Sequence, residues 1–122
     1  MLTTQICQGV HWVGYVDWSI RDFHSYDTHQ GTTYNAYLIL DERPALIDTV
    51  KAPYAAQLLQ SIGSLIDPAQ VQYIVCNHAE LDHSGSLPEL LRQMPDATVL
   101  CNKKCAAALA GHFETGRWKI RL

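Results

Sequence analysis

The first half of the chain carries apolar and polar residues in short alternating runs, a pattern typical of β-strands. Residues 9–18 (GVHWVGYVDW) alternate well enough to predict one strand. Residues 34–40 (YNAYLIL) and 44–50 (PALIDTV) are two further runs rich in strand-forming residues, and the polar DER joins them into a predicted hairpin. The polar, glycine-bearing segment 21–33 predicts a loop.

The second half changes to helical spacing, interrupted by apolar runs. A predicted helix opens at Pro53 and carries an apolar stripe at i, i+3, i+4, i+7, i+10 and i+11, made up of Ala55, Leu58, Leu59, Ile62, Leu65 and Ile66. Ser86 and Glu89 match a capping box at the start of a helix that runs to about Gln93. Further elements are a turn at 67–70, a helix at 102–113, and strands at 71–76, 97–101 and 118–122, the last only just begun.

Strands that alternate with helices predict an α/β layered fold with a mostly parallel sheet. Ligands of such sheets bind just beyond the carboxyl ends of the strands. The segment 77–86 follows one predicted strand directly, and Asp48 lies near the end of another. We therefore expect functional chemistry at this edge of the sheet.

Composition limits the function. A chain of 122 residues, 48% apolar and 17% charged, suits one globular domain. A net charge of -3 without a basic cluster argues against nucleic acid and anionic membrane as partners. The first ten residues do not resemble a signal peptide, and no apolar run is long enough to cross a bilayer. Together with four cysteines, this predicts a cytoplasmic protein with free thiols.

The segment 77–86 (NHAELDHSGS) gathers side chains that bind metals. His78, Glu80, Asp82 and His83 form H-x-E-x-D-H, and imidazole with carboxylate suits divalent zinc or iron. A loop can direct His78 and Glu80 one way and the other two another, which favours two adjacent ions. Gly85 would allow a tight turn before the following helix. The alternative is a solvated turn, but four candidate ligands in six residues favour metal binding, and spacing alone does not choose the metal.

These residues resemble a known family. HAELDHSGSL is similar to the metal motif of the metallo-β-lactamase fold, where most hydrolases have histidine at the position of Glu80. H-x-E-x-D-H instead resembles the flavodiiron proteins (A-type flavoproteins). DWSIRDFHSYDTHQGTTYNAYLI is very similar to the opening of that family, and ALIDT matches the first structural motif of the superfamily.

The resemblance implies roles for single residues. His78 and Glu80 would bind the iron nearer the flavin, and Asp82 and His83 the second iron, with His83 a position at which family members differ. His24 would lie just outside the ligands, near the pocket for oxygen or nitric oxide, or else be a loop histidine bonded to backbone. Asp48 would brace the ligand loop through hydrogen bonds without coordinating metal, or simply be solvated.

The chain departs from that family in what it lacks. The remaining ligands, two histidines and a bridging aspartate, are expected beyond residue 122, as is a flavodoxin-like domain that binds FMN. His112 is the only histidine after the motif, and it reads as a surface or packing residue. Residues 1–122 are therefore expected to be the incomplete, N-terminal half of a metallo-β-lactamase-like αββα sandwich, from a fragment or a truncated gene product.

The resemblance implies an oxidoreductase that reduces dioxygen to water or nitric oxide to nitrous oxide at a non-haem diiron site, with electrons from FMN. The electron donor would be a rubredoxin or a flavin reductase, and the full-length protein a homo-oligomer. The first alternative is a zinc hydrolase of the same fold that cleaves an ester or thioester, which Glu80 argues against. The second is a non-catalytic remnant of either enzyme, and this chain alone is expected to be inactive.

Two residue groups remain. Cys101 and Cys105 are four positions apart and could bind metal or pair if they lay on one helix. The sequence favours packing, because Cys101 ends an apolar strand and Cys76 lies in another. The aromatic residues of the first third could line a cofactor, although core or pocket wall is the preferred interpretation; they are Trp12, Tyr15, Trp18, Tyr26, Tyr34 and Tyr37.

Overall fold

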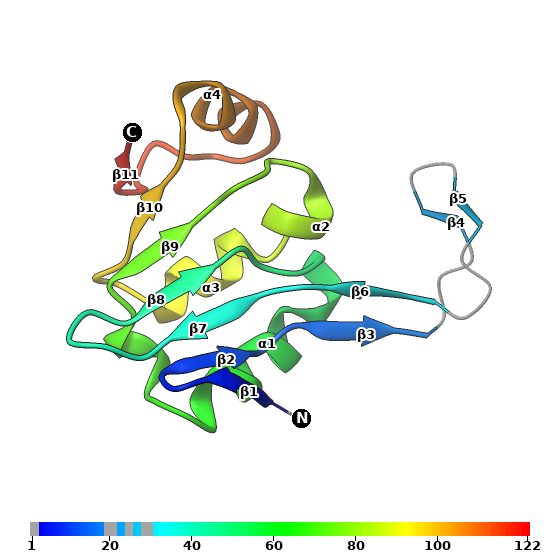
Figure 1. The fold of residues 1–122 in the computed structure, drawn as a ribbon. Helices are drawn as coiled ribbons and strands as arrows, with labels where there is room; N and C mark the ends of the chain where they lie inside the picture. Colours follow the sequence, from blue (N-terminus) through cyan, green and yellow to red (C-terminus); the bar gives the residue numbers. More distant parts are fainter. Residues whose placement is uncertain (1–2, 19–21, 24–25, 28–30) are drawn as a thin grey trace.

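The computed structural model describes residues 3–18, 22–23, 26–27 and 31–122. Within them, one main sheet forms the centre of the molecule, and two short ribbons extend from it (Figure 1). In spatial order, the strands of the main sheet are β1 (Thr4–Cys7), β2 (Val10–Trp12), β7 (Tyr37–Ile39), β8 (Ala45–Ile47), β9 (Tyr73–Val75), β10 (Thr98–Leu100) and β11 (Ile120–Arg121).

The main sheet is mixed, so the expectation of a mostly parallel sheet is wrong. The pairs β1–β2, β2–β7 and β7–β8 are antiparallel, whereas β8–β9, β9–β10 and β10–β11 are parallel. The difference follows from the connections. Short turns can join only antiparallel neighbours, whereas each parallel pair needs a crossover, and helices supply it in the second half. The α/β fold class is confirmed.

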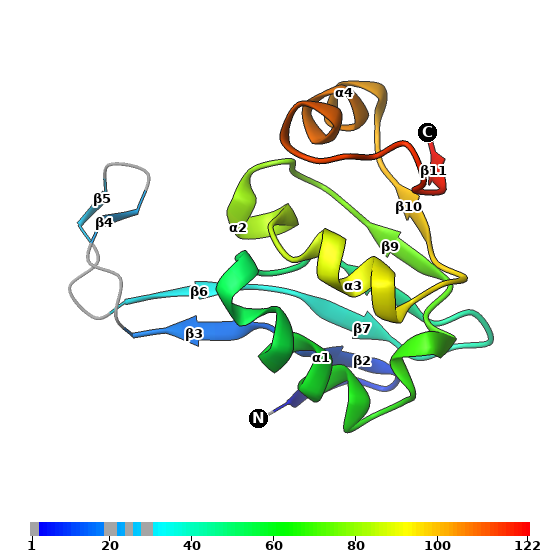
Figure 2. The same cartoon turned by 180° about the vertical axis from the view of Figure 1, so that it is seen from behind.

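Helices occupy the chain connections between the parallel strands. In chain order they are η1 (Ala52–Tyr54), α1 (Ala55–Gly63), η2 (Pro68–Gln70), α2 (Leu81–Ser84), α3 (Leu87–Gln93) and α4 (Lys103–His112), where η marks a 3-10 helix. Figure 2 shows α1 and α3 against one face of the sheet. The fully buried core there combines the central side chain of each middle strand with apolar helix residues: Leu38, Leu46, Ile74, Val99, Leu58, Ile62, Leu87 and Leu90.

The opposite face of the sheet is apolar as well but only partly covered. Tyr37, Ile47, Val75 and Leu100 pair in one row across the four central strands, and each is half-buried. Because successive side chains of a strand point to opposite faces, this row lies away from the helix-covered core. A half-exposed apolar sheet face is a surface that association can bury.

The predicted strand 9–18 is interrupted. It divides into β2 and β3 (Tyr15–Asp17), and β3 pairs with β6 (Thr32–Tyr34) in a separate ribbon. The break falls at Gly14, where a Cβ atom would lie 2.1 Å from the carbonyl oxygen of Tyr34, so only glycine fits.

Three more local predictions need correction. The predicted loop 21–33 holds β4 (Asp22–Phe23), β5 (Tyr26–Asp27) and the start of β6, and β1 was not predicted at all. Ser86 precedes α3 but makes no capping hydrogen bond, because its hydroxyl oxygen accepts from the backbone N–H of Val50 at 3.3 Å. Tertiary packing thus uses the side chain that the capping box required.

Candidate metal centre

The proposed ligands follow β9 at the carboxyl edge of the sheet, as expected. Residues 77–86 are not a plain loop, however, because Asp82 and His83 lie on the single helical turn of α2. Gly85 has an ordinary helical φ, so it does not provide a tight turn. It is needed for another reason: a Cβ atom there would lie 2.9 Å from the backbone nitrogen of Ala52. The ligand segment is therefore packed closely against η1.

The first two candidate ligands lie together on the exposed side of the segment. His78 Nε2 is 3.4 Å from Glu80 Oε1, and about half of each side chain is exposed, 53% and 47%. The backbone N–H of Glu80 donates to His78 Nδ1 at 3.1 Å. Only Ala79 separates the two residues in the sequence, so the imidazole of His78 and the carboxylate of Glu80 can approach each other.

The other two candidate ligands form a second pair beside the first. His83 Nε2 lies 3.2 Å from Asp82 Oδ2, and this carboxylate side chain is only 11% exposed. The rings of His78 and His83 stack with centroids 5.2 Å apart and an angle of 14° between their planes. The segment therefore places two imidazole–carboxylate pairs side by side.

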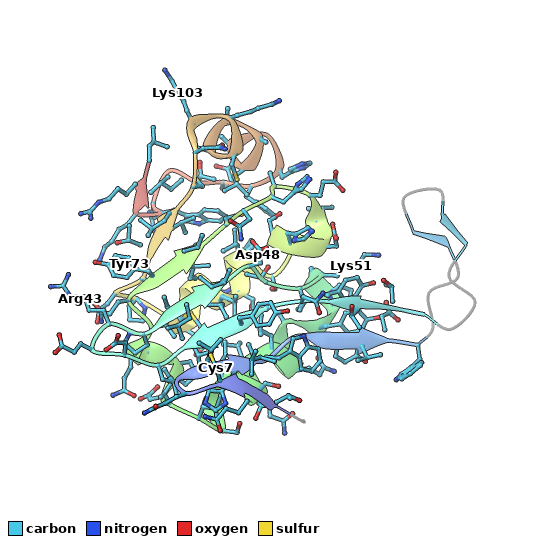
Figure 3. The ribbon with its side chains drawn as sticks, viewed as in Figure 1. Cys7, Arg43, Asp48, Lys51, Tyr73 and Lys103 are labelled. Atoms are coloured by element: carbon cyan, nitrogen blue, oxygen red, sulfur yellow. The ribbon has the colours of Figure 1, made fainter. Side chains whose placement is uncertain are left out.

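Asp48 joins the base of the segment to the second pair. Its Oδ1 accepts the backbone N–H of Asn77 at 2.8 Å, and its Oδ2 lies 3.2 Å from His83 Nδ1. The side chain lies between the end of β8 and α2 (Figure 3). Asp48 has φ 61°, a left-handed conformation that costs most residues roughly 1–2 kcal/mol and that aspartate tolerates better.

The hydrogen bond with Asp48 favours the tautomer of His83 that carries its proton on Nδ1. An ionised carboxylate can only accept, so in this tautomer Nδ1 donates to Asp48 and the neutral ring has a lone pair on Nε2. That lone pair faces Asp82 Oδ2, which places two electron-rich atoms 3.2 Å apart. A proton or a metal ion between them satisfies both. A carboxylate behind a metal-binding histidine is a common arrangement that orients the ring.

The donor atoms fit iron or zinc in kind but not in number. Imidazole and carboxylate both bind these ions. Among the described residues, no group of three or more histidine, cysteine, aspartate or glutamate side chains could hold an ion. Each pair thus offers two side-chain ligands, and a complete shell needs others. His24, predicted to lie near the ligands, falls outside the described residues.

Sequence reasoning missed a buried acid close to the site. Asp17 is 5% exposed, and its Oδ2 accepts from Tyr34 Oη at 2.7 Å and from Tyr54 Oη at 3.1 Å. Burial, followed by the bond to Asp17, raises the pKa of Tyr34, and the charge of Asp82 adds to this. Tyr34 is thus buried as expected, whereas Trp18 is 69% exposed and belongs to no core.

Some of the cysteines pack in the core and others do not. Cys76 and Cys105 are buried and free, Cys101 is half-buried and free, and Cys7 is exposed. The Cys76 thiol donates to the carbonyl oxygen of His78 at 3.1 Å, so it supports the ligand segment from below. Burial, followed by the charge of Cys105, raises the pKa of Cys76. At neutral pH, Cys76 is therefore a neutral thiol.

Comparisons with known proteins place this arrangement in a family. Residues 32–121 match a family model described as "ODP family beta lactamase". The chain belongs to this family. It is 46% identical over 110 residues to a nitric oxide reductase of Moorella thermoacetica, and the alignment covers 88% of this chain and 28% of that protein. It is 43% identical over 123 residues to a rubredoxin-oxygen oxidoreductase of Megalodesulfovibrio gigas, covering 100% of this chain and 31% of that protein.

The fold comparison agrees. The crystal structure of the flavodiiron protein from Giardia intestinalis superposes with a TM-score of 0.95 at 38% identity, covering 100% of this chain and 30% of that one. The resemblance to flavodiiron proteins and to the metallo-β-lactamase fold is thereby confirmed. The chain spans about a quarter to a third of the length of these relatives. In the described part of the chain, every helix is too short or too polar to span a membrane.

Proposed function

We propose that this chain supplies the first ligand segment of a diiron centre in an oxidoreductase that reduces dioxygen or nitric oxide. The observation that supports this most is the pairing itself. One segment presents His78 with Glu80 and, beside them, Asp82 with His83. Each pair would hold one iron, and the similar proteins named above are reductases of nitric oxide and of oxygen.

The chain's own residues have distinct tasks in this proposal. Asp48 fixes the ring of His83 and keeps Nε2 available to an ion. The backbone carbonyl of His83 accepts from the hydroxyl of Thr49 at 2.7 Å and from its N–H at 2.9 Å, which holds α2 against the end of β8. The ligands are thus positioned by rigid elements before an ion arrives, which reduces the cost of ordering them.

Iron held this way would supply electrons and an open coordination position to a small oxygen- or nitrogen-containing substrate. Glu80 brings a negative charge where a hydrolase of this fold has a neutral imidazole, and a carboxylate stabilises the higher charge of oxidised iron. Electrons would come from FMN, with a rubredoxin or a flavin reductase as donor. Residues 1–122 would be the first half of the metal domain.

The rival proposal is a zinc-dependent hydrolase of esters or thioesters. It is favoured by the shared fold, because a metallo-β-lactamase from Cronobacter sakazakii superposes with a TM-score of 0.69. At 24% identity, that likeness speaks for the fold alone. The carboxylate of Glu80 favours the reductase.

Activity distinguishes the two proposals. A full-length protein that contains this chain would be reduced with FMN and a rubredoxin, and its consumption of dioxygen and nitric oxide measured beside its hydrolysis of a thioester. Consumption of either gas without hydrolysis supports the reductase. Thioester hydrolysis without gas consumption overturns it.

A further inference from the structure

Two thiols from distant parts of the chain meet beneath the ligand segment. Cys76 follows β9, and Cys105 lies in the first turns of α4. Their sulfur atoms are 3.7 Å apart, and Cys105 Sγ also lies 3.6 Å from the carbonyl oxygen of Cys76. A disulfide has an S–S distance of about 2.05 Å. To form a disulfide, the two sulfurs must therefore approach by about 1.7 Å, the difference between 3.7 Å and 2.05 Å.

The backbone on both sides of the pair is held in place. The Cys76 N–H donates to the carbonyl of Leu100 at 2.9 Å, and the Cys105 N–H donates to the side chain of Asn102 at 2.7 Å. These backbone hydrogen bonds hold the two cysteines where their sulfurs face each other. Side-chain rotation must provide most of the approach, because the backbone is bonded on each side.

A cavity reaches one of the two cysteines from outside. It has a volume of about 280 Å³, and its lining includes Cys105, Lys104, Asn102 and His78. Cys76 is absent from that lining and is 3% exposed, against 7% for Cys105. A molecule as small as hydrogen peroxide fits this space easily. It would therefore meet Cys105 before Cys76.

We infer that Cys76 and Cys105 are an oxidisable dithiol that hydrogen peroxide closes to a disulfide. Cys105 is attacked first: its sulfur takes one oxygen atom from peroxide and becomes a sulfenic acid, and one water leaves. The Cys76 thiol then forms the S–S bond, and the sulfenic oxygen leaves as a second water. The two sulfurs lose two electrons in total, and these reduce one peroxide molecule.

The disulfide has a direct consequence for the ligand segment. The hydrogen on Cys76 Sγ, which is donated to the carbonyl of His78, is lost when the S–S bond forms. Oxidation of the pair thus removes one support of a proposed metal ligand. This inference does not depend on the reductase proposal, because the thiols and their cavity exist whatever the metal does.

Peptide mapping under non-reducing conditions tests the inference on the 122-residue chain. The test uses the Cys7→Ser variant of the chain, because Cys7 is an exposed thiol that would link separate molecules. One equivalent of hydrogen peroxide should give a peptide that joins Cys76 to Cys105, with loss of two hydrogens. Cys101→Ser is the matched control, and it should leave that peptide unchanged.

The order of attack is tested with two single variants, each checked for folding by circular dichroism. In Cys76→Ser, the sulfenic acid on Cys105 has no partner, and labelling of Cys105 by dimedone should rise several-fold over wild type. In Cys105→Ser, Cys76 should stay unlabelled. The inference is overturned if Cys105 remains a free thiol in wild type, or if the bridge forms between Cys101 and Cys105.

Discussion

Replacing Asp48 by asparagine tests how the second ligand pair is oriented. The carboxylate accepts with separate oxygens from the N–H of Asn77 and from His83 Nδ1. An amide of the same shape has only one acceptor oxygen. Asparagine tolerates the left-handed backbone as well as aspartate does, so φ 61° does not confound the comparison.

The structure sets the size of the effect. If the amide oxygen stays on Asn77, its NH₂ group faces His83 Nδ1, and the ring proton must move to Nε2. Charge-assisted bonds worth about 1.5–3 kcal/mol each become neutral bonds worth about 0.5–1.5 kcal/mol, so Asp48→Asn should lose about 1–3 kcal/mol of unfolding free energy. With a urea slope of about 1–3 kcal/mol per molar, the midpoint should fall by about 1 M.

Two measurements check this prediction. Urea unfolding followed by circular dichroism gives the free energy, and Asp96→Asn, which removes an exposed carboxylate, is the control that should change little. Nitrogen NMR of the histidine rings reports the tautomer, and His83 should change from Nδ1–H to Nε2–H. Metal affinity of the full-length protein should fall by roughly 10–100-fold, because Nε2 is then blocked. An unchanged tautomer together with unchanged stability would refute the role given to Asp48.

Three further predictions concern other parts of the chain. Tyr34→Phe removes a hydrogen bond to buried Asp17 and should lower the free energy of unfolding in urea by about 1.5–3 kcal/mol. Because the fold raises the pKa of Tyr34, the stability of the wild type should be full below about pH 10 and should fall as the pH rises further. This fall should be shallower in the variant, which lacks the hydroxyl. Ile47→Lys on the half-exposed sheet face should shift the chain from self-associated to smaller species in sedimentation velocity, whereas Gln60→Lys on the exposed side of α1 should not. The 122-residue chain alone should bind iron weakly and consume neither dioxygen nor nitric oxide, since each pair offers two ligands; a chain that holds two irons and turns over either gas would contradict this.

Local patterns carried much of the fold prediction. The hairpin of β7 and β8 and the helix α1 depend on neighbouring residues, and both formed where periodicity placed them. The helix is shorter than predicted, because α1 ends at Gly63, before the stripe residues Leu65 and Ile66. The break at Gly14 was not visible, because it results from the carbonyl of Tyr34 approaching from another strand. The Ser86 cap failed for the same reason, since Val50 reaches its hydroxyl from 36 positions away.

The candidate site shows the same division. Spacing and residue type suggested two ligand pairs for zinc or iron in one segment, but the family resemblance was needed to choose iron. The buried contacts of Asp17 with two tyrosines, and of Cys76 with Cys105, join residues 17 or more positions apart. Such contacts have no signature in a single sequence. Apart from the β7–β8 hairpin, the antiparallel pairs β1–β2 and β2–β7 were likewise missed, because strand–helix alternation describes only residues after β8.

The central claim is that the two pairs belong to an iron centre and that Glu80 helps to select this metal. Elemental analysis tests it most directly, on full-length protein that contains this chain and is expressed with iron and zinc both available. Wild type should contain iron, and Glu80→His should shift the content toward zinc, because a neutral imidazole replaces a carboxylate. Zinc in the wild-type protein, with no change in Glu80→His, would contradict the account.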